Sequence, residues 1–168
     1  MTAALAFFLA MVLAISAGHK LIDRRRLAAA TARLAGVPAP LGTPLMLSAA
    51  ACETLAALGL AIPPLRMGGA LVAAALWTIY ALALLRHRGG PLDCGCDFVR
   101  REKPVDTVAI FRPALLAALA LVIAFAPAAP MTLDAPFAAM ALYALWVAAS
   151  ELSALPSIGS ASLRRTRP

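Results

Sequence analysis

The chain has 168 residues, of which 62% are hydrophobic and 14% charged, so it is too apolar for a soluble domain, where about 25% of residues carry charge. Three cysteines are too few for a disulfide-dense secreted scaffold, and the scarcity of charge excludes a disordered chain. The net charge of +7 does not indicate nucleic acid binding, because the basic residues lie between apolar stretches, as in the cytoplasmic loops of membrane proteins.

Five apolar stretches approach the roughly 20 residues that a helix needs to cross a bilayer core of about 30 Å. They cover residues 2–18, 43–62, 67–85, 107–126 and 136–155. We therefore expect an all-α, polytopic membrane helix bundle with four core transmembrane helices and a fifth, forming one domain over residues 1–155. A cysteine-bearing loop over residues 86–106 joins the third and fourth spans, and a short basic tail follows over residues 156–168.

The first two spans have recognisable ends. The first stops at His19 and Lys20, and its charges follow the apolar run, whereas a signal peptide places positive charge before it. Thr43 as a cap and Pro44 in the first turn predict the start of the second helix. Two consecutive prolines at residues 63–64 predict its end after Ile62.

The later spans are bounded by charged residues. The third is uncharged and ends at Arg86, and Asp106 predicts an N-terminal cap for the fourth. Within the fourth span, Arg112 and Pro113 predict a kink, because proline removes a helical hydrogen bond. The fifth span is expected to begin after Asp134.

The distribution of basic residues predicts the orientation of the bundle. Residues 19–42, 86–112 and 156–168 contain 5, 6 and 3 of the 15 lysines and arginines, and the opposite side has only Arg66. Since cytoplasmic loops are enriched in basic residues, we expect a periplasmic or extracellular N-terminus and a cytoplasmic C-terminus.

The loop over residues 86–106 contains two thiols, Cys94 and Cys96, separated by one glycine. Thiols this close can exchange a disulfide, with a reactivity that the neighbouring basic side chains increase and the two flanking aspartates oppose. Inert loop cysteines are one alternative. A zinc site is another, but it needs four ligands, and the loop supplies only the two thiols and His87.

Glu53 lies at the middle of the second span, where a carboxylate costs about 2.5–3.5 kcal/mol on insertion scales and therefore needs a partner. Arg112 is the expected partner; alternatively, Arg112 reaches the cytoplasmic surface, or Glu53 is protonated and relays protons. Cys52, about 100° around the same helix, is expected to pack in an interface, with a third redox thiol as the alternative.

Four features, in this order along residues 10–126, resemble the MauE family of methylamine utilization proteins, within the wider group of DoxX-like, redox-associated membrane proteins. The first span ends in Gly-His-Lys at residues 18–20, and the second contains the central Glu53. Leu-Asp-Cys-Gly-Cys follows the third span at residues 92–96, and Arg112 opens the next apolar run. The chain departs from the family pattern at Asp97 and Pro113, where an aromatic residue and an asparagine are common.

This resemblance implies a protein of the bacterial inner membrane that helps to produce active periplasmic methylamine dehydrogenase, whose small subunit is rich in disulfides. It further implies a thioredoxin-like partner, MauD, with Cys94 and Cys96 as the redox pair and with Glu53 and Arg112 in support. No motif identifies a metal or a cofactor, and a quinone is an alternative without a motif of its own.

Two other functions fit the same residues. A non-catalytic membrane scaffold would bind a partner through its helix faces and tolerate replacement of the cysteines. A small proton-coupled exporter would use Glu53 alternately for protons and for a cationic substrate.

Overall fold

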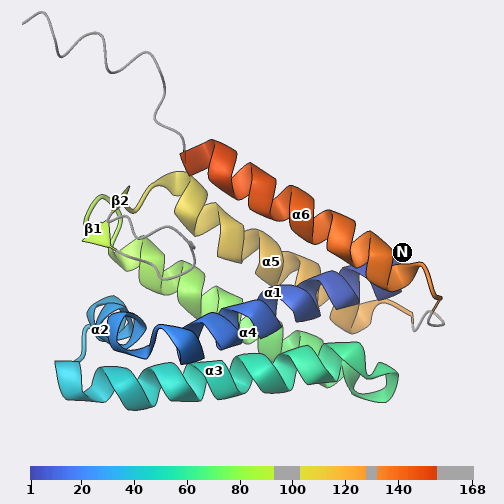
Figure 1. Cartoon of the computed structure of the whole chain (residues 1–168), viewed down its shortest axis with the longest axis horizontal. Helices are drawn as coiled ribbons and strands as arrows, with labels where there is room; N and C mark the ends of the chain where they lie inside the picture. Colours follow the sequence, from blue (N-terminus) through green and yellow to red (C-terminus); the bar gives the residue numbers. More distant parts are fainter. Residues whose placement is uncertain (93–102, 128–131, 155–168) are drawn as a thin grey trace, which may run out of the picture.

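The computed structural model describes residues 1–92, 103–127 and 132–154 (Figure 1). Its helices are α1 (Thr2–Ile22), α2 (Arg24–Ala35), α3 (Ala39–Ala61), α4 (Arg66–Arg86), α5 (Thr107–Phe125) and α6 (Ala135–Ala154). A 3-10 turn, η1 (Pro63–Leu65), joins α3 to α4, and β1 (Pro91–Leu92) pairs antiparallel with β2 (Lys103–Pro104).

Among the described residues, five helices are long and apolar enough to cross a membrane: α1, α3, α4 with η1, α5 and α6. The expected all-α membrane bundle is therefore confirmed. Large apolar side chains cover its outside, as a lipid-facing surface requires, and examples are Leu55, Val122, Phe137 and Leu145.

The bundle interior is built mainly from small side chains. Neighbouring pairs are α1 with α3, α3 with α4, α4 with α5, and α1 with α6. Alanines on all five spanning helices fill the core, with larger side chains such as Leu9, Leu13 and Trp77 between them. Helices with small facing residues can approach closely, which favours association in lipid, where no hydrophobic effect draws helices together.

The approach of α3 to α4 is closest at two glycines. A Cβ placed on Gly69 would lie 2.5 Å from the backbone nitrogen of Leu60 and 2.8 Å from the Cα of Gly59. Neither distance is sterically allowed, so this crossing requires glycine on both helices.

The start of α3 differs from the prediction. The helix begins at Ala39, with Pro38 before it and Pro40 in its first turn, so Pro44 lies inside the helix and Thr43 is not its cap. The first turn of a helix tolerates proline because its N–H groups have no intrahelical partner. Pro40, and not Pro44, is the proline in the first turn of α3. The predicted end is confirmed, since Ile62 is the C-cap.

The segment between the first two spans forms a helix that the sequence interpretation did not include. Leu27 and Ala28 of α2 pack against Met46 of α3 in a small separate cluster. A Cβ on Gly42 would collide with the carbonyl oxygen of Ala28, so α2 sits directly on the α3 backbone. Gly36 ends α2 in the left-handed conformation, with φ +67°.

The last two helices start as predicted. The Asp106 carboxylate accepts a 2.8 Å hydrogen bond from the backbone nitrogen of Ala109 and caps α5. The helix continues through Pro113 to Phe125, so it is not broken there, and the kink itself stays a prediction. A hydrogen bond from the Thr132 side chain lowers the pKa of Asp134. Asp134 lies directly before α6, where the helix dipole stabilises a negative charge.

Candidate functional site

The most buried charged side chain in the described part of the chain is Glu53, whose exposed fraction is 1%. It lies on the inner face of α3 and meets side chains from α1 and α4. Lys20 Nζ is 2.6 Å from its Oε1 and 2.8 Å from its Oε2. The hydroxyls of Ser16 and Tyr80 also donate to Oε1, at 3.1 Å and 2.9 Å.

This cluster satisfies its polar groups almost completely. Besides its two bonds to Glu53, the Lys20 ammonium donates to Ser16 Oγ at 2.8 Å, so all three of its N–H groups are used. The ammonium also lies 5.6 Å from the centroid of the Tyr80 ring, within the range of a cation–π contact. A buried ion pair needs such additional hydrogen bonds, because Coulomb attraction alone rarely offsets the loss of hydration.

The expected pairing of Glu53 with Arg112 is wrong. Arg112 Nη2 instead donates to the backbone oxygen of Ser150 at 3.0 Å and so connects α5 to α6. The partner is Lys20, at which the first apolar run was predicted to stop. The spacing of Ser16 and Lys20 was the available signal, since residues four apart share one face of a helix.

Cys52 does not pack in an interface as expected, because its side chain is exposed on the outside of the bundle. The inner face of α3 is formed by Met46, Ala50, Glu53 and Leu60. A step of one residue rotates the side chain by about 100°, which turns Cys52 away from this face. The role of Cys52 as a third redox thiol stays a prediction.

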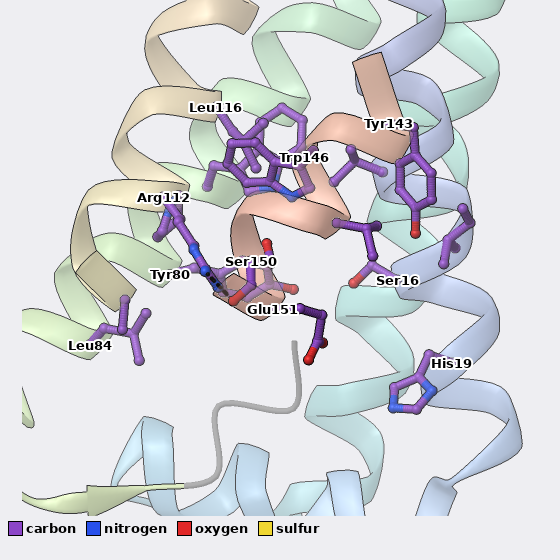
Figure 2. Close-up of a pocket in the computed structure, with 16 residues that line it drawn as sticks. Ser16, His19, Tyr80, Leu84, Arg112, Leu116, Tyr143, Trp146, Ser150 and Glu151 are labelled. Atoms are coloured by element: carbon purple, nitrogen blue, oxygen red, sulfur yellow. Dashed lines mark hydrogen bonds between the residues drawn. The ribbon is translucent and has the colours of Figure 1, made fainter. Parts of the chain in front are cut away.

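Beside the Glu53 cluster, α1, α4, α5 and α6 enclose a pocket of about 170 Å³ (Figure 2). Its lining includes four aromatic side chains: Trp77, Tyr80, Tyr143 and Trp146. The polar side chains in the lining are those of Ser16, His19, Arg112, Ser150 and Glu151. Figure 2 shows them gathered below the Trp146 ring, so the pocket has an aromatic part and a polar part.

The pocket adjoins the Glu53 cluster on one side. Ser16 and Tyr80 line the pocket, and both donate hydrogen bonds to Glu53. A molecule in the pocket would therefore lie beside two residues whose hydroxyl groups donate to the carboxylate of the buried ion pair.

On another side the pocket adjoins the base of the cysteine-bearing loop. Leu84 and Ala109 line it and also pack against Val105, which follows β2. Backbone hydrogen bonds join Val105 to Gly89 and Gly90, so both ends of the loop are fixed at the same place. Cys94 and Cys96 themselves lie outside the described residues.

Comparison with known proteins identifies relatives of this chain. The family model described as methylamine utilisation protein MauE matches residues 1–126, which include the whole Glu53 cluster and Arg112. The methylamine utilization protein MauE of Paracoccus denitrificans is 41% identical over 76 residues, which are 43% of this chain. That match spans 40% of the length of the relative. No solved structure matches the chain.

Proposed function

The chain belongs to the MauE family, and from this premise we propose that it serves methylamine utilisation as a membrane thiol–disulfide exchange protein. Cys94 and Cys96 are the redox pair, and they alternate between dithiol and disulfide by exchange with a partner protein. The proposed client is the disulfide-rich small subunit of periplasmic methylamine dehydrogenase, and the proposed partner is the thioredoxin-like protein MauD. The protein would then lie in the bacterial inner membrane.

The observation that carries this proposal is the fixed base of the loop. In the sequence, two thiols separated by one residue lie between β1 and β2. The two strands pair Pro91 with Pro104 and Leu92 with Lys103, and this pairing holds the two ends of the segment together. The chain therefore enters and leaves the cysteine-bearing segment at one end of the bundle, which suits exchange with an external protein.

The orientation of the bundle sets a condition on the mechanism. The positive-inside rule places this end at the cytoplasmic face, whereas the proposed client is periplasmic. Electrons must then pass between the two faces, and the buried polar cluster and the pocket lie between them.

Redox trapping in native membranes tests the exchange. Cells are quenched with acid, free thiols are alkylated, and the state of Cys94 and Cys96 is read by mass spectrometry with and without the partner. We expect a disulfide in part of the population and, in the Cys96→Ser variant, an accumulating mixed disulfide that identifies the partner. Cys52→Ser is the matched control and should leave client maturation unchanged.

Full maturation of the client in the Cys94→Ser/Cys96→Ser double variant would contradict thiol exchange. That result would favour a scaffold. An exporter is disfavoured by the ion pair between Glu53 and Lys20, because the carboxylate is not a solitary cation-binding group.

A further inference from the structure

We infer that the pocket between α1, α4, α5 and α6 binds the head group of a membrane-soluble quinone. This inference rests on the proposed function for its redox role, but the binding itself depends only on the pocket. Three properties of the pocket carry it: its size, its position between α5 and α6, and the chemistry of its polar side chains.

The size matches a six-membered ring. A cavity of about 150 Å³ in another protein accommodates benzene, and this pocket has about 170 Å³. The indole rings of Trp77 and Trp146 line it and offer flat apolar surfaces against which a ring can stack. A bare ion or a small amine would leave most of this space unfilled.

The position of the pocket gives a lipid-soluble ligand a way in. Helix α6 packs along α1, and within the described residues it makes little direct contact with α5. The pocket lies at this seam, lined by Pro113 and Leu116 of α5 and by Val147 of α6. An isoprenoid tail would pass between α5 and α6 into the bilayer while the ring stays inside.

The polar groups of the pocket suit a neutral ligand with hydrogen-bond acceptors. The Tyr143 hydroxyl has no hydrogen-bond partner within the described part of the chain, and in Figure 2 it points to the polar part of the pocket. The guanidinium of Arg112, which donates to the backbone oxygen of Ser150, also lines the pocket. Arg112 and Glu151 contribute opposite charges, so neither a cation nor an anion is favoured. Quinone carbonyl oxygens are neutral acceptors and meet these requirements.

The redox step balances without another reactant. Oxidation of the Cys94 and Cys96 dithiol to a disulfide releases two electrons and two protons, and reduction of a quinone to a quinol takes up two of each. The quinone is thus the oxidant, and the quinol leaves into the bilayer.

Tryptophan fluorescence provides a direct binding assay, because the chain contains only two tryptophans and both line the pocket. The full chain is purified in quinone-free lipid nanodiscs and titrated with ubiquinone-1, a short-tailed quinone. We expect saturable quenching. The isosteric variant Tyr143→Phe should weaken binding by about three- to tenfold, the usual effect of losing one hydrogen bond.

A matched pair of variants on α6 separates the pocket from the bilayer. Val147→Phe fills the pocket and should weaken binding at least tenfold, whereas Leu145→Phe adds a phenylalanine on the exposed outside of the same helix and should change nothing. Quenching that does not saturate, or that responds equally to both variants, means partition into the lipid only and overturns the inference.

The same titration in the Cys94→Ser/Cys96→Ser variant keeps the two proposals distinct. Binding should persist there, since the described lining of the pocket contains no cysteine. Exchange of thiols without quinone binding would overturn only the pocket assignment, and binding together with dispensable cysteines would overturn only the proposed function.

Discussion

Glu53 is tolerated in the middle of the bundle because Lys20, Ser16 and Tyr80 donate four hydrogen bonds to its two oxygens. The charge of the carboxylate is balanced by an ammonium whose own donors are all used. A carboxylate in lipid without these partners would be costly. The ion pair therefore stabilises the bundle only as a complete cluster.

Removing one charge should be worse than removing both. We expect Glu53→Gln to lower the free energy of unfolding by about 3 kcal/mol, at the low end for a broken buried pair because Lys20 keeps an exposed fraction of 15%. The Lys20→Met/Glu53→Gln double variant should recover at least half of this loss. Reversible unfolding in SDS, followed by circular dichroism, measures both values.

Tyr80→Phe is the control, because it removes one neutral donor and keeps both charges. It should cost only about 1 kcal/mol. Lys20→Met alone completes the comparison. If the losses of unfolding free energy in Glu53→Gln and Lys20→Met simply added in the double variant, Lys20 and Glu53 would not be coupled, and the cluster would not act as a unit.

At the scale of the helices, close packing is decided by which residues meet at a crossing. Gly68 and Gly69 are neighbours in α4, yet a Cβ on Gly68 would have nothing within 4 Å, whereas one on Gly69 would overlap the α3 backbone. The composition of α4 does not distinguish these two glycines. Only the crossing with α3 does.

These two glycines form a matched pair for experiment. Gly69→Ala should destabilise the bundle by about 1–3 kcal/mol, because α3 and α4 must separate to make room for a methyl group. Gly68→Ala should be neutral or stabilise by up to about 1 kcal/mol through its higher helix propensity. Thermal unfolding in detergent compares them, and equal effects would refute the close crossing.

The cap of α5 makes a second prediction at this scale. Asp106→Ala should cost about 1 kcal/mol, since the N–H of Ala109 loses its acceptor. Asp106→Asn should restore most of the loss, because asparagine is an equally good cap. The SDS unfolding midpoints of the three proteins check this order, and an unchanged midpoint in the alanine variant would show that the cap contributes nothing.

At the scale of the whole molecule, the alternating direction of the spanning helices collects the basic segments at one end. In Figure 1, α2, the end of α4 and the start of α5 lie at the end opposite to the N-terminus. Arg66 lies at the start of α4, towards the other end. The bundle thus has one strongly basic end and one end with few charges, as a fixed orientation in the membrane requires.

Labelling in intact cells tests this orientation. In a background with all three cysteines replaced by serine, Leu133→Cys lies in the connection before α6, and Arg88→Cys follows α4; both positions are exposed. A membrane-impermeant maleimide should label position 133 and not position 88 until the cells are permeabilised. The opposite pattern would reverse the orientation.

Much of the fold followed from the sequence alone. Hydropathy predicts the five spans because a helix in lipid needs a continuous apolar length, and Asp106 predicts the start of α5 because capping is a local interaction. The helix α2 escaped this reasoning, because its 12 residues are too few and too polar to span a membrane, and hydropathy identifies only spans. Thr43 was misjudged as a cap because two prolines four residues apart both suit a first turn.

For the candidate site, the sequence by itself determined the chemical groups: a buried acid at residue 53, the basic residues around the loop, and the paired thiols. The tertiary structure decided which of these groups meet. It gave Glu53 the partner Lys20 instead of Arg112, turned Cys52 outwards, and brought the aromatic side chains of α4 and α6 into one pocket. Composition and periodicity fix what each helix carries and which face is apolar, but contacts between helices depend on their rotation and depth, which only packing in three dimensions sets.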